Sequence, residues 1–205
     1  HGFDIHIVGL NISPDNPALA QLISKQQLAR EERAIAIGDK LVKCGFDDIY
    51  QEAKRLAKRG SITRAHFAQV LFNRGEIKHL QAAFDKYLGK GKRAFVKPKW
   101  CDIQEAVEII HQAQGVAVMA HPIRYDLSGK WLRKLIVEFA DVGGDALEIV
   151  LPQMNPQQKQ TMLSFCQEYN LHASMGSDFH APSKWSDLGR NLTLPEQCQP
   201  VWQLF

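Results

Sequence analysis

Two histidine-bearing motifs, each placed directly after a short apolar run, constrain the fold of this 205-residue chain most strongly. Ala120-His121-Pro122 follows the run 116–119, and Gly176-Ser177-Asp178-Phe179-His180 follows the run 172–175. Short apolar runs bounded by turn residues are typical of buried strands. In α/β barrels the chemistry lies at the carboxyl ends of the strands. The two motifs therefore predict imidazole and carboxylate groups at one rim, and these groups suit metal ions.

Helix and strand patterns alternate in the second half of the chain. The expected helices are 102–114, 129–140 and 155–169, and the expected strands are 116–120, 146–150, 171–175 and a short 192–194. Regular alternation of this kind implies parallel strands joined by right-handed crossovers. Residues 3–11 form a further expected strand of the same layer. In that strand Ile5 and Ile7 share one face, so His6 lies on the other.

Only helical patterns occur between the first strand and the second half of the chain. The expected helices are 17–43, 47–58, 63–73 and 78–88, each closed by a nearby glycine. We therefore expect three parts. A barrel strand lies in 1–13, a mostly helical insertion occupies 14–97, and the rest of the α/β layer occupies 98–205.

Charge is distributed unevenly along the chain. The window from Lys54 to Lys99 contains 13 Lys and Arg residues and two acidic residues, a net charge of +11, whereas the remaining residues carry −8. A basic block beside an acidic remainder predicts a partner with several phosphates, although a solvated helical surface would carry the same charges.

Composition restricts the setting in which the chain works. No apolar run approaches the roughly 20 residues that span a bilayer, so no membrane contact is expected. The four cysteines are widely spaced and form no CxxC pair. They are interpreted as reduced thiols, which predicts a cytoplasmic location.

Four separated motifs, in order, resemble the PHP family, the polymerase-and-histidinol-phosphatase metallohydrolases. They are DIHIVGLNI around His6, SITRAHFA at 61–68, AHPIRY at 120–125 and GSDFHAP at 176–182. The resemblance covers essentially the whole chain and is strongest to the bacterial branch of 3′,5′-nucleoside bisphosphate phosphatases and 5′-to-3′ exoribonucleases. It implies an α/β fold, namely the C-terminal portion of a distorted (β/α)7 barrel with a mostly helical insertion.

The resemblance also implies up to three divalent metal ions, with Mn²⁺ as the first choice and Fe²⁺ or Zn²⁺ as alternatives. His6 and His121 would share one ion, Asp178 would serve a second, and His180 a third. The family has further ligands before its equivalent of His6, whereas only five residues precede His6 here. We therefore expect that a missing N-terminal segment completes the barrel, and that the 205 residues alone are nearly inactive.

The expected function is metal-dependent hydrolysis of nucleotide phosphates, either nucleoside 3′,5′-bisphosphates or the 5′ ends of short RNA. Clustered metal ions activate a bound water for attack at phosphorus, so no side-chain base is assigned. Arg64, His66 and Arg124 are candidate phosphate contacts, because guanidinium groups and helix N-termini bind phosphate. Two alternatives stay open. One is a small-molecule phosphatase of the histidinol-phosphate type, and the other is a non-catalytic RNA-binding domain.

Overall fold

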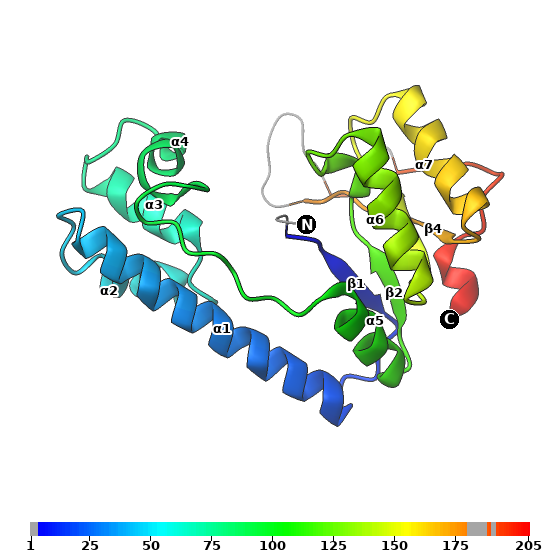
Figure 1. Cartoon of the computed structure of the whole chain (residues 1–205), viewed down its shortest axis with the longest axis horizontal. Helices are drawn as coiled ribbons and strands as arrows, with labels where there is room; N and C mark the ends of the chain where they lie inside the picture. The colour runs from blue at the N-terminus through cyan, green and yellow to red at the C-terminus, as the bar shows by residue number, and fades with distance from the viewer. Residues whose placement is uncertain (1–3, 180–187, 190–191) are drawn as a thin grey trace. The chain divides into compact units, whose positions relative to one another are not determined.

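Figure 1 shows the computed structural model of the chain, which describes residues 4–179, 188–189 and 192–205. By its internal contacts the chain divides into two compact units. The first unit holds His1–Ala20 and Cys101–Phe205, and the second holds Gln21–Trp100. The first unit mixes strands and helices, whereas the second is helical in its described elements.

A four-stranded sheet forms the centre of the first unit in its described part. The strands β1 (Ile7–Leu10), β2 (Val116–Met119), β3 (Ala146–Val150) and β4 (His172–Met175) lie side by side in chain order. The strands β2, β3 and β4 are parallel, as the helix–strand alternation predicts. β1, however, runs antiparallel to β2. No single helical crossover joins these two strands, because the whole second unit separates them, so the parallel rule does not apply.

Three helices cover one face of this sheet: α5 (Ile103–Gln112), α6 (Gly129–Asp141) and α7 (Pro156–Glu168). Figure 1 shows α6 lying along the sheet. α5 and α7 follow the N-caps Asp102 and Asn155, at the expected helix starts, and each cap side chain accepts a backbone N–H at 2.8 Å. The covered strand residues are Ala117, Met119, Leu147, Ile149 and Ala173. Each large apolar side chain buried here contributes about 1.5–3 kcal/mol to stability.

The opposite face of the sheet has a smaller apolar patch. The patch consists of Leu10, Val116, Val118, Ala146 and Val201, the last from η3 (Val201–Leu204). The expected strand at 192–194 is wrong, because these residues have no strand pairing. Instead the edge of β4 is occupied by residues 199–200, where the Ala173 N–H donates to the Gln199 carbonyl at 2.7 Å.

Helices also account for the described secondary structure of the second unit. They are α1 (Pro17–Val42), which begins in the first unit, α2 (Ile49–Ala57), α3 (Arg64–Asn73), α4 (Leu80–Ala83) and the π-helix η1 (Phe84–Leu88). The unit has its own core, in which Leu41, Ile49, Phe67, Leu71 and Leu88 are fully buried. Among the described residues, no helix has both the length and the apolar character needed to cross a membrane.

Asp145 connects elements at the edge where β2 and β3 begin. Its Oδ2 accepts the Ala117 N–H at 2.7 Å and lies 2.7 Å from Nε2 of His111, in the last turn of α5. The carboxylate thus accepts the N–H of a β2 residue in place of a backbone carbonyl from a neighbouring strand, and it fixes the end of α5 through His111. Polar groups at this edge of an α/β layer commonly serve stability rather than chemistry.

Replacing Asp145 is therefore expected to weaken the first unit. Asp145→Ala leaves the Ala117 N–H without its acceptor and should lower the free energy of unfolding by about 1–3 kcal/mol. Urea denaturation measures the loss. Asp141→Ala removes an exposed carboxylate from the end of α6 and is the control. Equal unfolding free energies for the two variants would contradict this role.

Candidate active site

His6 and His121 meet at one edge of the sheet. His6 precedes β1 and His121 follows β2, and the antiparallel register pairs Ile7 with Met119. The amino end of β1 therefore lies beside the carboxyl end of β2. Nδ1 of His6 is 3.2 Å from Nε2 of His121, and the two ring centroids are 5.0 Å apart. Two residues 115 positions apart in the sequence thus present their imidazoles to each other.

The separation of these two nitrogens fits a shared metal ion. Nitrogens that each bind one ion at about 2.1 Å lie about 3.0–3.4 Å apart when the ligand angle is near 90–110°. Nδ1 of His121 is buried and has no hydrogen-bond partner among the described residues. A buried polar atom without a partner is unfavourable, but this nitrogen is not the one that faces His6, so the case for a shared ion rests on the 3.2 Å separation. Within residues 4–179, 188–189 and 192–205, no cluster of three or more ligand side chains forms.

Tyr125 holds the backbone on both sides of the histidine pair. His121 has a left-handed backbone, with φ 37°, and the short helix η2 (Pro122–Arg124) follows it. After this turn, Tyr125 lies against the ends of β1 and β2. Its hydroxyl accepts the His6 N–H at 2.9 Å and donates to the Ala120 carbonyl at 3.1 Å. Burial raises the pKa of Tyr125 to about 12, so the phenol stays protonated and can donate.

Glu148 supports His121 from the neighbouring strand. It lies within β3, where its Oε2 accepts the His121 N–H at 2.7 Å. Burial raises the pKa of this carboxyl group, and the negative charge of Asp178 adds to the effect, while the His121 N–H and Arg124 oppose it. The carboxylate thereby fixes the strained turn that carries His121.

Gly176 makes room for the Glu148 side chain. A Cβ atom at position 176 would lie 1.8 Å from Oε1 of Glu148. Any other residue at position 176 would push the Glu148 carboxylate out of its present place. The glycine of the second histidine motif therefore keeps that carboxylate beside the His121 N–H.

Arg124 and Asp178 form an ion pair at the same edge. Nη1 of Arg124 donates to Oδ2 of Asp178 at 2.9 Å, and the arginine side chain is 43% exposed against 20% for the aspartate. Asp178 has a left-handed backbone, with φ 48°. The structure thus places an expected phosphate contact against an expected metal ligand. The remaining expected ligand, His180, lies outside the described residues.

Arg64 and His66 belong to the second unit, at the start of α3. Thr63 is the N-cap, and its N–H donates to Nδ1 of His66 at 3.0 Å. This bond completes a capping box with His66 in the third helical position. The guanidinium carbon of Arg64 lies 5.9 Å from the ring centroid of Phe84. His66 therefore has a structural partner, whereas Arg64 is held beside an aromatic ring.

Comparison with known proteins identifies the family. No family model matches the chain. A 5′-3′ exoribonuclease from Haemophilus influenzae is 47% identical over 204 residues, which span 100% of this chain and 74% of that protein. The chain belongs to the PHP family. A second relative, the 3′,5′-nucleoside bisphosphate phosphatase of Chromobacterium violaceum, is 36% identical over 201 residues, or 97% of this chain and 70% of that protein.

The solved structures agree with the PHP assignment. A Chromobacterium violaceum structure described as an amidohydrolase, with bound sulfate and no metal, has a TM-score of 0.84 and 36% identity. The match covers 97% of this chain and 70% of that one. This PHP-family chain is thus a hydrolase with a mixed α/β fold.

The sequence patterns assigned no role to Glu148 or to Tyr125 in this PHP-family site. Glu148 is the one charged residue in the apolar strand ALEIV, and that break in the pattern is the signal that could have revealed it. Tyr125 gives a weaker signal, because an aromatic residue after a strand is more often a core residue. Its contacts depend on the pairing of β1 with β2, which the sequence does not show.

The burial of the Tyr125 phenol predicts a pH effect on stability. The folded protein raises the pKa of the phenol from 10.0 to about 12, so the unfolded chain loses this proton first. The contribution is present below about pH 10 and is lost as the pH rises to about 12, a fall of about 2–3 kcal/mol in the free energy of unfolding. Tyr125→Phe should show a flatter curve in urea titrations over this range. Parallel curves for the two proteins would contradict the assignment.

The contact between Gly176 and Glu148 predicts a coupling between the two positions. Gly176→Ala displaces the carboxylate and should lower the free energy of unfolding by about 2 kcal/mol. Adding Glu148→Ala removes the clash, so the double variant should lose less than the sum of the single losses. Gly129→Ala, where an added Cβ meets nothing within 4 Å, is the control. Strict additivity would rule out the contact.

Proposed function

We propose that this chain carries the catalytic rim of a metal-dependent phosphoesterase that acts on nucleoside 3′,5′-bisphosphates, on the 5′ ends of short RNA, or on both. The observation that carries the proposal is the 3.2 Å approach of the His6 and His121 nitrogens. The names of the relatives, an exoribonuclease and a bisphosphate phosphatase, favour nucleotides over histidinol phosphate. The +11 charge of residues 54–99 favours the same choice, because a small monophosphate needs no broad basic surface.

The proposed metal ions are divalent, with Mn²⁺ as the first choice and Fe²⁺ or Zn²⁺ as alternatives. His6 and His121 would hold one ion through the two nitrogens that face each other. Asp178 and His180 are the proposed further ligands. A divalent ion bound at this rim supplies a Lewis acid for phosphate oxygens and lowers the pKa of the attacking water.

The chain's own residues orient the rim and receive the phosphate. Tyr125 fixes the backbone at His6, and Glu148 fixes the backbone at His121, so the imidazoles keep their relative position. Arg124 pairs with Asp178 through Nη1 and is partly exposed, so the rest of its guanidinium group can donate hydrogen bonds to a substrate phosphate. Arg64 and His66 are proposed as additional phosphate contacts at the N-terminus of α3.

The proposal includes the complete fold. A distorted (β/α)7 barrel with residues 14–97 as a helical insertion is supported by the parallel β2–β4 layer, by its single face of helices and by the TM-score of 0.84. All four cysteines are free thiols, which supports a reducing, cytoplasmic location.

The test compares metal binding and hydrolysis in matched histidine variants of the full-length protein. His121→Asn should weaken Mn²⁺ binding in calorimetry and slow release of phosphate from a nucleoside 3′,5′-bisphosphate and from 5′-phosphorylated RNA. The expected loss exceeds the roughly 10- to 100-fold that removal of an outer partner of a metal ligand causes. His79→Asn is the control, because His79 caps α4 and asparagine is a preferred cap.

Two results would contradict the proposed function. One is equal Mn²⁺ affinity and equal hydrolysis in the His121 and His79 variants. The other is a protein that binds RNA but hydrolyses none of these esters with Mn²⁺, Fe²⁺ or Zn²⁺, which would favour a non-catalytic RNA-binding domain. Hydrolysis of histidinol phosphate with no activity on nucleotides would shift the assignment to the small-molecule phosphatase.

A further inference from the structure

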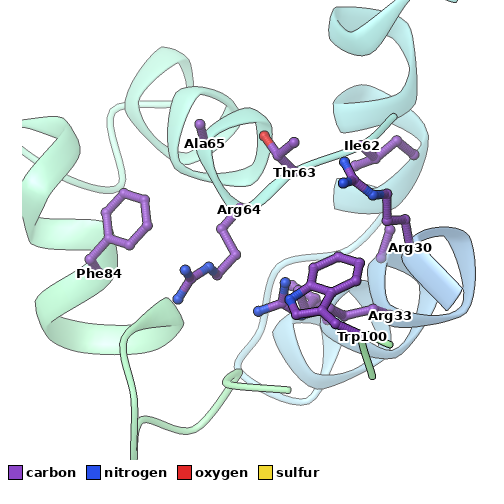
Figure 2. Close-up of a pocket in the computed structure, with 10 residues that line it drawn as sticks. Arg30, Arg33, Ile62, Thr63, Arg64, Ala65, Phe84 and Trp100 are labelled. Atoms are coloured by element: carbon purple, nitrogen blue, oxygen red, sulfur yellow. The ribbon is translucent and has the colours of Figure 1, made fainter. Parts of the chain in front are cut away.

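A hollow of about 300 Å³ lies entirely within the second unit (Figure 2). This volume is at the lower end of the range for pockets that hold small ligands, about 300–1,000 Å³. We call it the arginine hollow. The side chains that matter for the argument are Arg30, Arg33, Thr63, Arg64, Phe84 and Trp100.

Positive charge dominates the lining of the arginine hollow. Arg30 and Arg33 come from α1, and their spacing of three places them on one face of that helix. Arg64 is the first residue of α3. Among the described residues that line the hollow, none has a carboxylate. Three guanidinium groups around one concave surface, with no acidic counterpart in the lining, constitute a site for an anion with several oxygen acceptors.

The arginines are held in place by local contacts. Nε of Arg33 donates to the Val96 carbonyl at 3.0 Å, which ties the helix to the segment after η1. The guanidinium carbon of Arg30 lies 4.9 Å from the Trp100 ring centroid, and that of Arg64 lies 5.9 Å from the Phe84 ring centroid. Such cation–π contacts orient a guanidinium group without using its hydrogen-bond donors. The cations are thus partly preorganised.

Aromatic rings beside the cations distinguish a nucleotide from a simple anion. Figure 2 shows Phe84 and Trp100 on either side of the Arg64 side chain. Phe84 begins the π-helix η1, an irregularity that often marks a functional position. Single-stranded nucleic acids bind where cationic groups follow the phosphates and aromatic rings stack on the bases. An acidic peptide offers carboxylates but no planar bases for these rings.

We propose that the arginine hollow binds one nucleotide of a single-stranded RNA, with the guanidinium groups on its phosphate and Trp100 beside its base. The choice of RNA as the ligand rests on the proposed function. The cationic and aromatic lining does not depend on it. The hollow adds Arg30, Arg33 and Trp100 to the residues proposed to contact RNA.

The test measures RNA binding apart from hydrolysis. The probe is a fluorescein-labelled single-stranded RNA of about six nucleotides, within known single-strand site sizes, and EDTA prevents cleavage during anisotropy titrations. Arg30→Gln should weaken binding about 5- to 10-fold and reduce the slope of log affinity against log salt by about one. Arg59→Gln removes the same charge from an exposed position of the same unit outside the hollow, and it is the matched control.

A second variant tests the aromatic part of the proposal. Trp100→Leu should weaken RNA binding while leaving the affinity for pyrophosphate unchanged, because only the base loses a partner. Arg30→Gln should weaken both ligands, and Arg30→Lys should retain part of the affinity. Circular dichroism verifies that each variant is folded.

Three outcomes would overturn the arginine-hollow proposal. They are equal loss of affinity in the Arg30 and Arg59 variants, no loss in either, and competition by polyglutamate as strong as that by unlabelled RNA. Failure of the proposed function is a separate result. A full-length parent protein that hydrolyses no phosphate ester, but whose RNA affinity depends on Arg30 and Trp100, would refute the enzyme and support the hollow.

Discussion

The antiparallel pairing of β1 with β2 is the constraint on which the candidate site depends. It places the residue before β1 beside the residue after β2, so His6 and His121 share an edge although the whole helical unit separates them in sequence. In a parallel pair, His6 would lie at the opposite edge of the sheet, one strand length away. The apolar side chains Ile5 and Ile7 hold this register, because a slip of one residue would turn them out of the core.

The groups around the histidines act mainly on backbone positions. Tyr125 and Glu148 each bind a main-chain N–H of a histidine, and Gly176 leaves the space that Glu148 fills. Left-handed backbone at His121 is unfavourable for a residue with a Cβ, so it persists only when neighbouring contacts require it. Tyr125 and Glu148 therefore fix the backbone positions of the two histidines, and a metal ligand needs such fixed positions from its surroundings.

The helical unit contributes a different kind of chemistry. Three of its arginines, from α1 and α3, line one hollow together with the aromatic rings of Phe84 and Trp100. The sequence predicts the helices and their basic character well, because periodicity and glycine stops are local signals. It does not predict which arginines meet. Arg30 lies outside the basic window of residues 54–99, and only folding places it over Trp100.

Local patterns in the sequence were sufficient for the α/β layer, the helices, the caps at Asp102 and Asn155, and the association of His121 with a strand end. They were insufficient for the direction of β1, for Glu148 under His121, for the pairing of Arg124 with Asp178 and for the absence of a strand at 192–194. Helix propensity, capping and alternation act over a few residues, so they can be recognised in one dimension. Strand direction and side-chain partners across 27 to 119 residues are settled by packing, which only the tertiary structure contains.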